Sequence, residues 1–131
     1  MPSERVHSLV DYWEGPRSGV ADLHGMPHTF ECVFDELADQ WSDLFVLQPI
    51  DAGTLALVQE NWARWLRWQA AFDRGEVGME THPVLPDERP DYGKCAVEIR
   101  RRLEAREAPK QRWRGKFEGE KNDWRVIWSA E

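Results

Sequence analysis

The sequence is poor in cysteine and has no long apolar run. Cys32 and Cys95 are the two cysteines among 131 residues, so the chain could form at most one disulfide. A chain of this length buries a sufficient core without a disulfide, and we therefore expect two free, buried thiols. No stretch approaches the roughly 20 apolar residues of a membrane-spanning helix, and the first residues lack the apolar core of a signal peptide. These absences predict a cytoplasmic protein with no membrane partner.

Common catalytic motifs are missing as well. The sequence contains no P-loop, no dinucleotide-binding fingerprint, no HExxH and no GxSxG motif. We therefore assign no catalytic residue and expect no cofactor; a protein without enzymatic activity is favoured, and an enzyme stays an open alternative.

Basic residues are scarce in the first half of the chain. Residues 1–60 contain two basic residues against eleven acidic ones, whereas residues 61–131 contain fifteen against thirteen. The net charge of -7 disfavours non-specific binding to nucleic acid or to an anionic membrane. Residues 94–116 are locally basic, so contact between nucleic acid and the basic second helix stays a weaker alternative function.

Apolar and aromatic residues are plentiful. Hydrophobic residues make up 41% of the chain and charged residues 31%, which is typical of a globular protein. Eight tryptophans are present, and each can bury about 150 to 250 Å² of surface. The length and this composition predict a single domain over residues 1–131.

Hydrophobic periodicity predicts strands at both ends of the chain and helices between them. Residues 19–34 alternate around the turn at His24 and Gly25, and residues 44–47 form a continuous apolar run, so we expect three strands there. Amphipathic helices are expected over residues 51–74 and 91–108, and a closing hairpin over residues 113–128.

The order β-β-β-α-α-β-β favours an α+β fold, with an antiparallel sheet of about five strands covered by two helices. On the second strand, His28, Phe30, Cys32 and Phe34 are expected to face the core. The alternative is a small, partly open barrel with helices, because glycines in the strands would let the sheet curl. The sequence does not separate these two arrangements.

Four segments carry a resemblance to known proteins: residues 11–22, 27–31, 62–72 and 82–86. Over about two thirds of its length the chain resembles a family of small uncharacterised bacterial proteins with no assigned activity. The resemblance implies only a small bacterial protein, and it transfers no catalytic residue because no activity is assigned to that family.

His24, His28 and Cys32 recur at spacings of four and are residue types that zinc accepts. Four residues of a strand span about 13 Å, so His28 and Cys32 cannot share one ion unless the strand bends. His24 and His28 come closer only if the turn folds back, and we expect no metal. A thiol on an apolar strand face should have a raised pKa and stay unreactive, which argues against a cysteine nucleophile.

The preferred interpretation is a small non-catalytic protein-binding module, such as an adaptor, an inhibitor or an immunity-type protein. Partly exposed tryptophans anchor protein interfaces, and Trp68 lies at the flank of the apolar stripe of the first helix. An acidic connector precedes the third strand. The residues expected to contact the partner are Asp35, Asp39, Asp43, Trp41 and Trp68.

The main alternative is a small-ligand-binding protein or enzyme with a pocket between the sheet and the helices. Such a pocket would need convergent polar groups within an aromatic cavity. The residues expected to line it are Arg17, His28, Trp62, Trp65 and Tyr92. The chain is expected to be a monomer or a homodimer, the latter formed if open strand edges pair.

Overall fold

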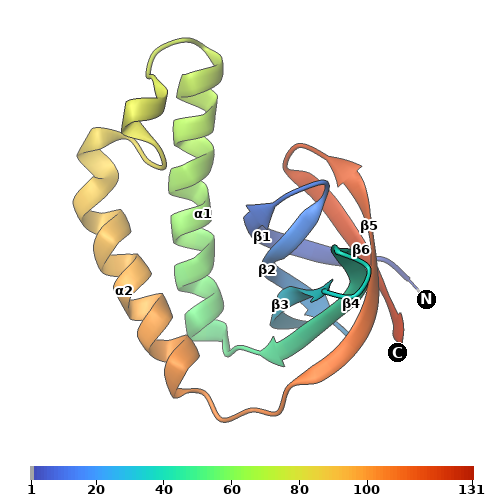
Figure 1. Ribbon diagram of the computed structural model, residues 1–131. Helices are drawn as coiled ribbons and strands as arrows, with labels where there is room; N and C mark the ends of the chain where they lie inside the picture. Colours follow the sequence, from blue (N-terminus) through green and yellow to red (C-terminus); the bar gives the residue numbers. More distant parts are fainter. Residues whose placement is uncertain (1) are drawn as a thin grey trace. The chain divides into compact units, whose positions relative to one another are not determined.

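The computed structural model describes residues 2–131, which form two compact units (Figure 1). The barrel unit comprises the residues up to Asp51 together with Glu107–Glu131, and the helical unit comprises Ala52–Arg106. The prediction of one domain over the whole chain stays a prediction. The barrel unit contains β1 (Glu4–Tyr12), β2 (Pro16–Leu23), β3 (Met26–Asp35), β4 (Gln40–Pro49), β5 (Gln111–Glu120) and β6 (Asp123–Ala130). The helical unit contains α1 (Ala52–Asp73), α2 (Arg89–Ala105) and two short 3₁₀ helices, η1 (Met79–Thr81) and η2 (Pro86–Glu88).

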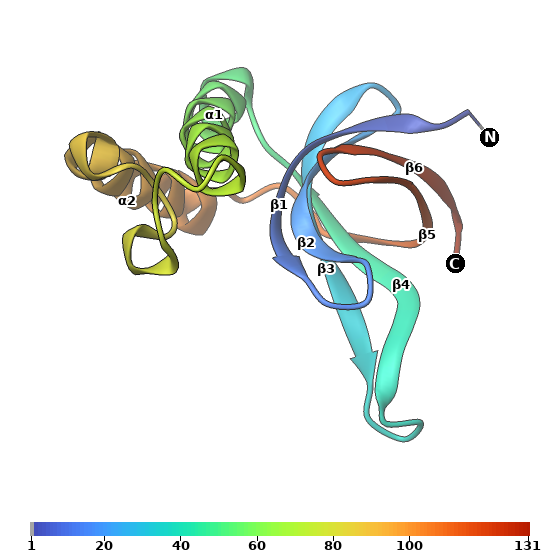
Figure 2. The same cartoon turned by 90° about the horizontal axis from the view of Figure 1, so that it is seen from above.

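The described strands form a closed barrel in the order β1-β2-β3-β4-β5-β6, with every neighbouring pair antiparallel. Closure comes from the first and last strands, where Glu4 pairs with Val126 and Arg5 with Arg125 (Figure 2). The α+β class is confirmed, but the open sheet of about five strands is wrong, and the barrel alternative is closer. A closed barrel encloses its own core and leaves no sheet edge along the paired segments.

Strand β1 was not predicted from the sequence, because its irregular pairing removes the usual alternation of buried and exposed residues. The pairing of β1 with β2 shifts register three times between Val6 and Tyr12. As a result His7 and Ser8 are buried side by side, which destroys the alternation by which a strand is recognised.

The core of the barrel consists of strand side chains. Phe30, Phe45, Phe117 and Trp128 form a cluster with ring centroids 5.1 to 6.1 Å apart. Trp128 is 1% exposed, and its indole Nε1–H donates to the backbone carbonyl of Asp22 at 2.9 Å. The buried indole nitrogen of Trp128 therefore has a hydrogen-bond partner, as buried polar atoms generally do.

The alternation predicted for β3 is confirmed over most of its length. His28, Phe30 and Cys32 are buried. Phe34 was expected in the core and is instead exposed, because the pairing of β3 with β4 shifts register between Cys32 and Phe34. A bulge of this kind turns the residues beyond it to the other face.

Both helices predicted from the sequence are present. In the helical unit Trp68 is 2% exposed and donates from Nε1 to Thr81 Oγ1 at 2.8 Å. Its ring stacks on Phe72 and meets the edge of His82. The expected exposure of Trp68 is therefore wrong, because the segment after α1 folds back over its ring. Within residues 2–131, neither α1 nor α2 has the length and apolar character that a membrane crossing demands.

Candidate binding site at the hairpin end of the barrel

Three hairpins turn at the same end of the barrel. Because neighbouring strands are antiparallel, the β1–β2, β3–β4 and β5–β6 turns all lie opposite the β2–β3 turn. We call this the hairpin end and define it as residues 10–18, 33–43 and 114–124. The β3–β4 hairpin extends beyond the others, as Figure 2 shows.

Large apolar side chains at the hairpin end are exposed. Trp13 is 68% exposed at the β1–β2 turn, and Tyr12 beside it is 58% exposed. Phe34 packs edge-on against Trp41 with ring centroids 5.1 Å apart. Exposed aromatics scattered singly need no explanation, but several at one end of a small barrel mark a candidate interaction surface. The exposed large apolar residues of this end are Val10, Tyr12, Trp13, Phe34 and Leu37.

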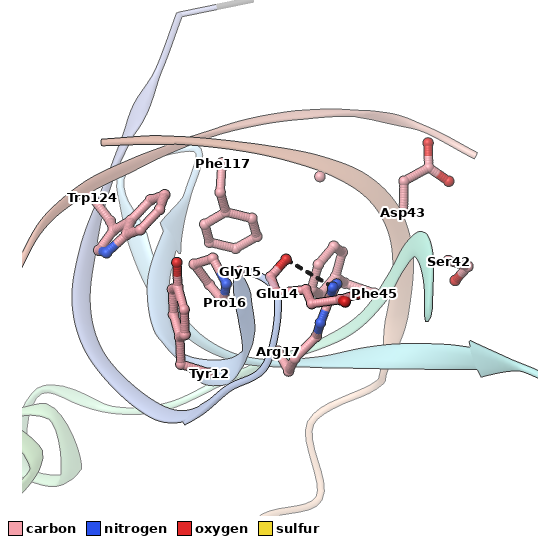
Figure 3. Close-up of a pocket in the computed structure, with 11 residues that line it drawn as sticks. Tyr12, Glu14, Gly15, Pro16, Arg17, Ser42, Asp43, Phe45, Phe117 and Trp124 are labelled. Atoms are coloured by element: carbon pink, nitrogen blue, oxygen red, sulfur yellow. Dashed lines mark hydrogen bonds between the residues drawn. The ribbon is translucent and has the colours of Figure 1, made fainter. Parts of the chain in front are cut away.

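A pocket of about 370 Å³ opens at the hairpin end (Figure 3). Four aromatic residues, each from a different strand, contribute to its wall, and Tyr12 and Trp124 meet there with ring centroids 5.9 Å apart. Its lining residues are Tyr12, Glu14, Gly15, Pro16, Arg17, Ser42, Asp43, Phe45, Gly115, Phe117 and Trp124.

Gly115 lines the pocket at a point where β5 lies close to the aromatic core. A Cβ at that position would lie 2.6 Å from Cζ3 of Trp128 and 3.0 Å from Cδ1 of Phe45. Glycine therefore lets β5 approach the aromatic core closely, and the pocket lies directly above that core.

Arg17 is held in place by the turn that it follows. Its Nε–H donates to the Trp13 carbonyl at 2.6 Å, and Nη2 donates to the Glu14 carbonyl at 3.0 Å. The guanidinium carbon lies 5.4 Å from the centre of the Trp41 ring, in a cation–π contact. Backbone carbonyls and an indole face thus stabilise this cation on the pocket wall.

The charge of the hairpin end is strongly acidic. Its three segments contain nine Asp or Glu residues and four Lys or Arg residues, a formal net charge of -5. Asp43 pairs with Arg114 at 2.6 Å across the β4–β5 ladder. The Glu14 carboxylate is exposed on the pocket rim.

Most of the residues predicted to bind a partner lie together at the hairpin end. Asp35 accepts hydrogen bonds from the backbone N–H groups of Leu37 and Ala38, so it also stabilises the β3–β4 turn. Asp39 is exposed and has a φ of 53°, at the last position of that turn. Asp43 and Trp41 lie on β4. Trp68 is the exception, since it is buried in the helical unit.

The residues predicted to line a ligand pocket are divided between the two units. Arg17 lines the pocket at the hairpin end. His28 is buried in β3, and its Nδ1 lies 2.7 Å from the carbonyl oxygen of Met26. Trp62 and Trp65 stack on each other along α1, and the carbonyl of Tyr92 in α2 accepts a hydrogen bond from Asn61. A pocket built from all five stays a hypothesis.

The predicted character of the cysteines is confirmed. Cys32 and Cys95 are free and buried, and burial raises the pKa of both thiols. Cys32 donates to the Ser42 carbonyl at 3.2 Å, which also favours the neutral thiol. Over residues 2–131 no three His, Cys, Asp or Glu side chains gather as metal ligands would.

Several arginines of the locally basic residues 94–116, which were considered for contact with nucleic acid, are paired within the chain. Arg101 and Arg102 both bind Glu98 in α2, and Arg112 pairs with Glu131. Hydrogen bonds from Arg101 and Arg102 lower the pKa of Glu98 from 4.5 to about 2.

Sequence reasoning missed Tyr12, Phe117, Gly115 and Trp124 as pocket residues. Tyr12 belongs to the missed strand, and Trp124 and Phe117 belong to the predicted closing hairpin without any sign that they face Tyr12. The alternation within that hairpin indicated which of its residues face the core. Only the closure of the barrel shows that Tyr12 of β1 forms the pocket wall beside Trp124.

Comparison of the chain with protein-family models, with curated proteins and with solved structures finds no match in any of the three.

Proposed function

We propose that the chain is a non-catalytic protein-binding module whose hairpin end docks a partner with a basic surface. The observation that carries this proposal is the exposure of Tyr12 and Trp13 at the hairpin end, which has a net charge of -5. Tyrosine and tryptophan are enriched among the few residues that dominate the binding energy of protein interfaces. The excess of carboxylates at this end would attract a cationic partner and favour its rapid association.

The pocket supports a second candidate function, the binding of a small molecule. Its volume of about 370 Å³ lies at the lower end of the range for ligand sites, roughly 300 to 1,000 Å³. Arg17 would then be the polar anchor. A protein-docking function is favoured because the exposed apolar side chains extend well outside the pocket, as far as Leu37 at the β3–β4 turn.

Site-specific photocrosslinking in the source cells tests the docking surface. A benzophenone amino acid replaces Trp13 in one variant and Met26 in the control. Met26 is similarly exposed, at 61%, but lies next to the opposite turn. We expect one protein adduct of defined mass from position 13 and none from position 26. Equal adducts at both positions, or no protein adduct at position 13, would contradict the proposal.

Charge reversal tests the chemistry of the partner. Glu36→Lys changes an exposed carboxylate of the hairpin end, whereas Glu107→Lys changes an exposed carboxylate of the same unit outside that end. Exposed charges at an interface act mainly on the association rate, so we expect Glu36→Lys to reduce the adduct by about 3-fold or more at low salt. The control variant should retain the adduct, and equal effects of the two variants would exclude a specific acidic surface.

A further inference from the structure

The pocket has aromatic walls that suit a cation. Tyr12 and Trp124 are tilted by 50° to each other on one side, and Phe117 and Phe45 continue the wall toward β5 (Figure 3). The Trp124 indole is fixed by the bond from its Nε1–H to the Lys121 carbonyl at 2.7 Å. Aromatic faces carry partial negative charge and attract a cation within about 6 Å of the ring centre.

Arg17 demonstrates that this end of the barrel stabilises a positive charge. Its guanidinium already uses two backbone carbonyls and the Trp41 ring. In Figure 3, Gly15 and Pro16 lie between Arg17 and the pair formed by Tyr12 and Trp124. The aromatic pair is therefore a separate place for a second cation.

Charge decides between a cationic and an anionic occupant. The pocket lining contains the carboxylates of Glu14 and Asp43 and the single cation of Arg17. An anion would meet aromatic faces, one arginine that is already engaged, and the net charge of -5 of the hairpin end as a whole. A cation would meet complementary charge both in the pocket lining and over the hairpin end as a whole.

We propose that this pocket takes the side chain of a lysine from the partner, with its ammonium group against Tyr12 and Trp124. The inference rests on the proposed docking function. Lysine is preferred to arginine because Asp43 is shared with Arg114, which leaves no free pair of carboxylates for the fork of a guanidinium. The alkyl stem of lysine suits the apolar wall above Phe117.

Titration of the full chain with four amides tests the proposal. The probes are the Nα-acetyl N-methylamides of lysine, norleucine, glutamate and arginine, each up to about 100 mM because single side chains bind weakly. The readout is the indole N–H resonance of Trp124, identified with the Trp124→Phe variant. We expect a saturable shift with the lysine amide and an affinity about 5- to 30-fold lower for norleucine, which has the same stem without the charge.

Two variants give the matched control. Tyr12→Leu removes one ring of the pocket and should abolish the shift, whereas Trp13→Leu removes the neighbouring exposed ring, which does not line the pocket, and should preserve it. Binding of norleucine or glutamate as tight as lysine, or no saturable shift, would overturn the inference. Tighter binding of arginine would overturn the choice of lysine.

The crosslinking result separates this inference from the proposed function. A protein adduct at position 13 without lysine binding in the pocket would leave the docking function standing and refute the pocket. Saturable lysine binding without any protein adduct would refute the docking function and point to a small cationic molecule as the occupant.

Discussion

Substitution of Gly115 by alanine tests the close approach of β5 to the barrel core. The added Cβ would lie 2.6 Å from Trp128 and 3.0 Å from Phe45. These rings are 1% and 2% exposed, so neither can swing into solvent. The neighbouring rings must therefore shift within a closely packed core, or the strand must move outward.

Two opposing effects set the magnitude. Overpacking a core by one methyl group costs about 1 to 3 kcal/mol. Alanine also restricts the unfolded chain, which stabilises the folded protein by about 0.4 to 1 kcal/mol when the backbone conformation suits it. We therefore expect Gly115→Ala to lower the free energy of unfolding by about 1.5 kcal/mol. With a urea m value near 2 kcal/mol/M, the unfolding midpoint falls by about 0.7 M.

Urea denaturation measures this loss, and amide hydrogen exchange in β5 and β6 assigns it to the barrel unit. Gly93→Ala is the control, since nothing lies within 4 Å of its added Cβ in α2. That change should stabilise the helix by up to about 1 kcal/mol. Gly19→Ala should cost more than Gly115→Ala, because its Cβ would meet the Ser8 carbonyl oxygen at 2.1 Å and backbone cannot yield. A Gly115→Ala barrel as stable as the parent would refute this reasoning.

Other predictions concern the core, one carboxylate and the thiols. Trp128→Phe leaves the Asp22 carbonyl without its buried donor and opens a cavity, so the free energy of unfolding should fall by about 2 to 4 kcal/mol in a thermal melt; a change below 1 kcal/mol would contradict it. A carboxyl titration by NMR should place the midpoint of Glu98 near 2, so its stabilisation of the folded state is present above pH 4.5 and lost as the pH falls toward 2; a midpoint at 4.5 would exclude the two arginine contacts. The raised pKa values of Cys32 and Cys95 predict slow reaction with a thiol reagent at pH 8, about 100-fold slower than in the denatured chain, and a loss of stability as the pH rises above 9; equal rates in the two states would show that the thiols are accessible.

Local periodicity was enough to predict the helices, the turn at Gly25 and most of the buried face of β3. It failed where pairing with a distant strand decides the conformation. β1 has bulges that remove its alternation, and Phe34 follows a bulge that reverses its side. Trp68 was misplaced because the residues that cover it, Thr81 and His82, come from a segment with no periodicity of its own.

The candidate site was predictable only in part. The acidic connector and Trp41 pointed to the β3–β4 hairpin, and Arg17 was among the residues predicted to line a ligand pocket. The aromatic wall was not predictable, because Tyr12 and Trp124 meet only after the first and last strands close the barrel. The positions of Tyr12 and Trp124 in the sequence do not indicate that their side chains are in contact.

The pairing of β1 with β6 also dictates how the chain must assemble on the ribosome. The partner of Glu4 is Val126, so β1 lacks this neighbour until the helical unit and β5 have been synthesised. Until then β1 to β4 emerge as an open sheet with two unpaired edges, whereas the contiguous helical unit completes its local contacts first. The nascent chain is therefore most exposed to aggregation during the interval between β4 and β5, when the edge of β4 that later receives β5 is bare.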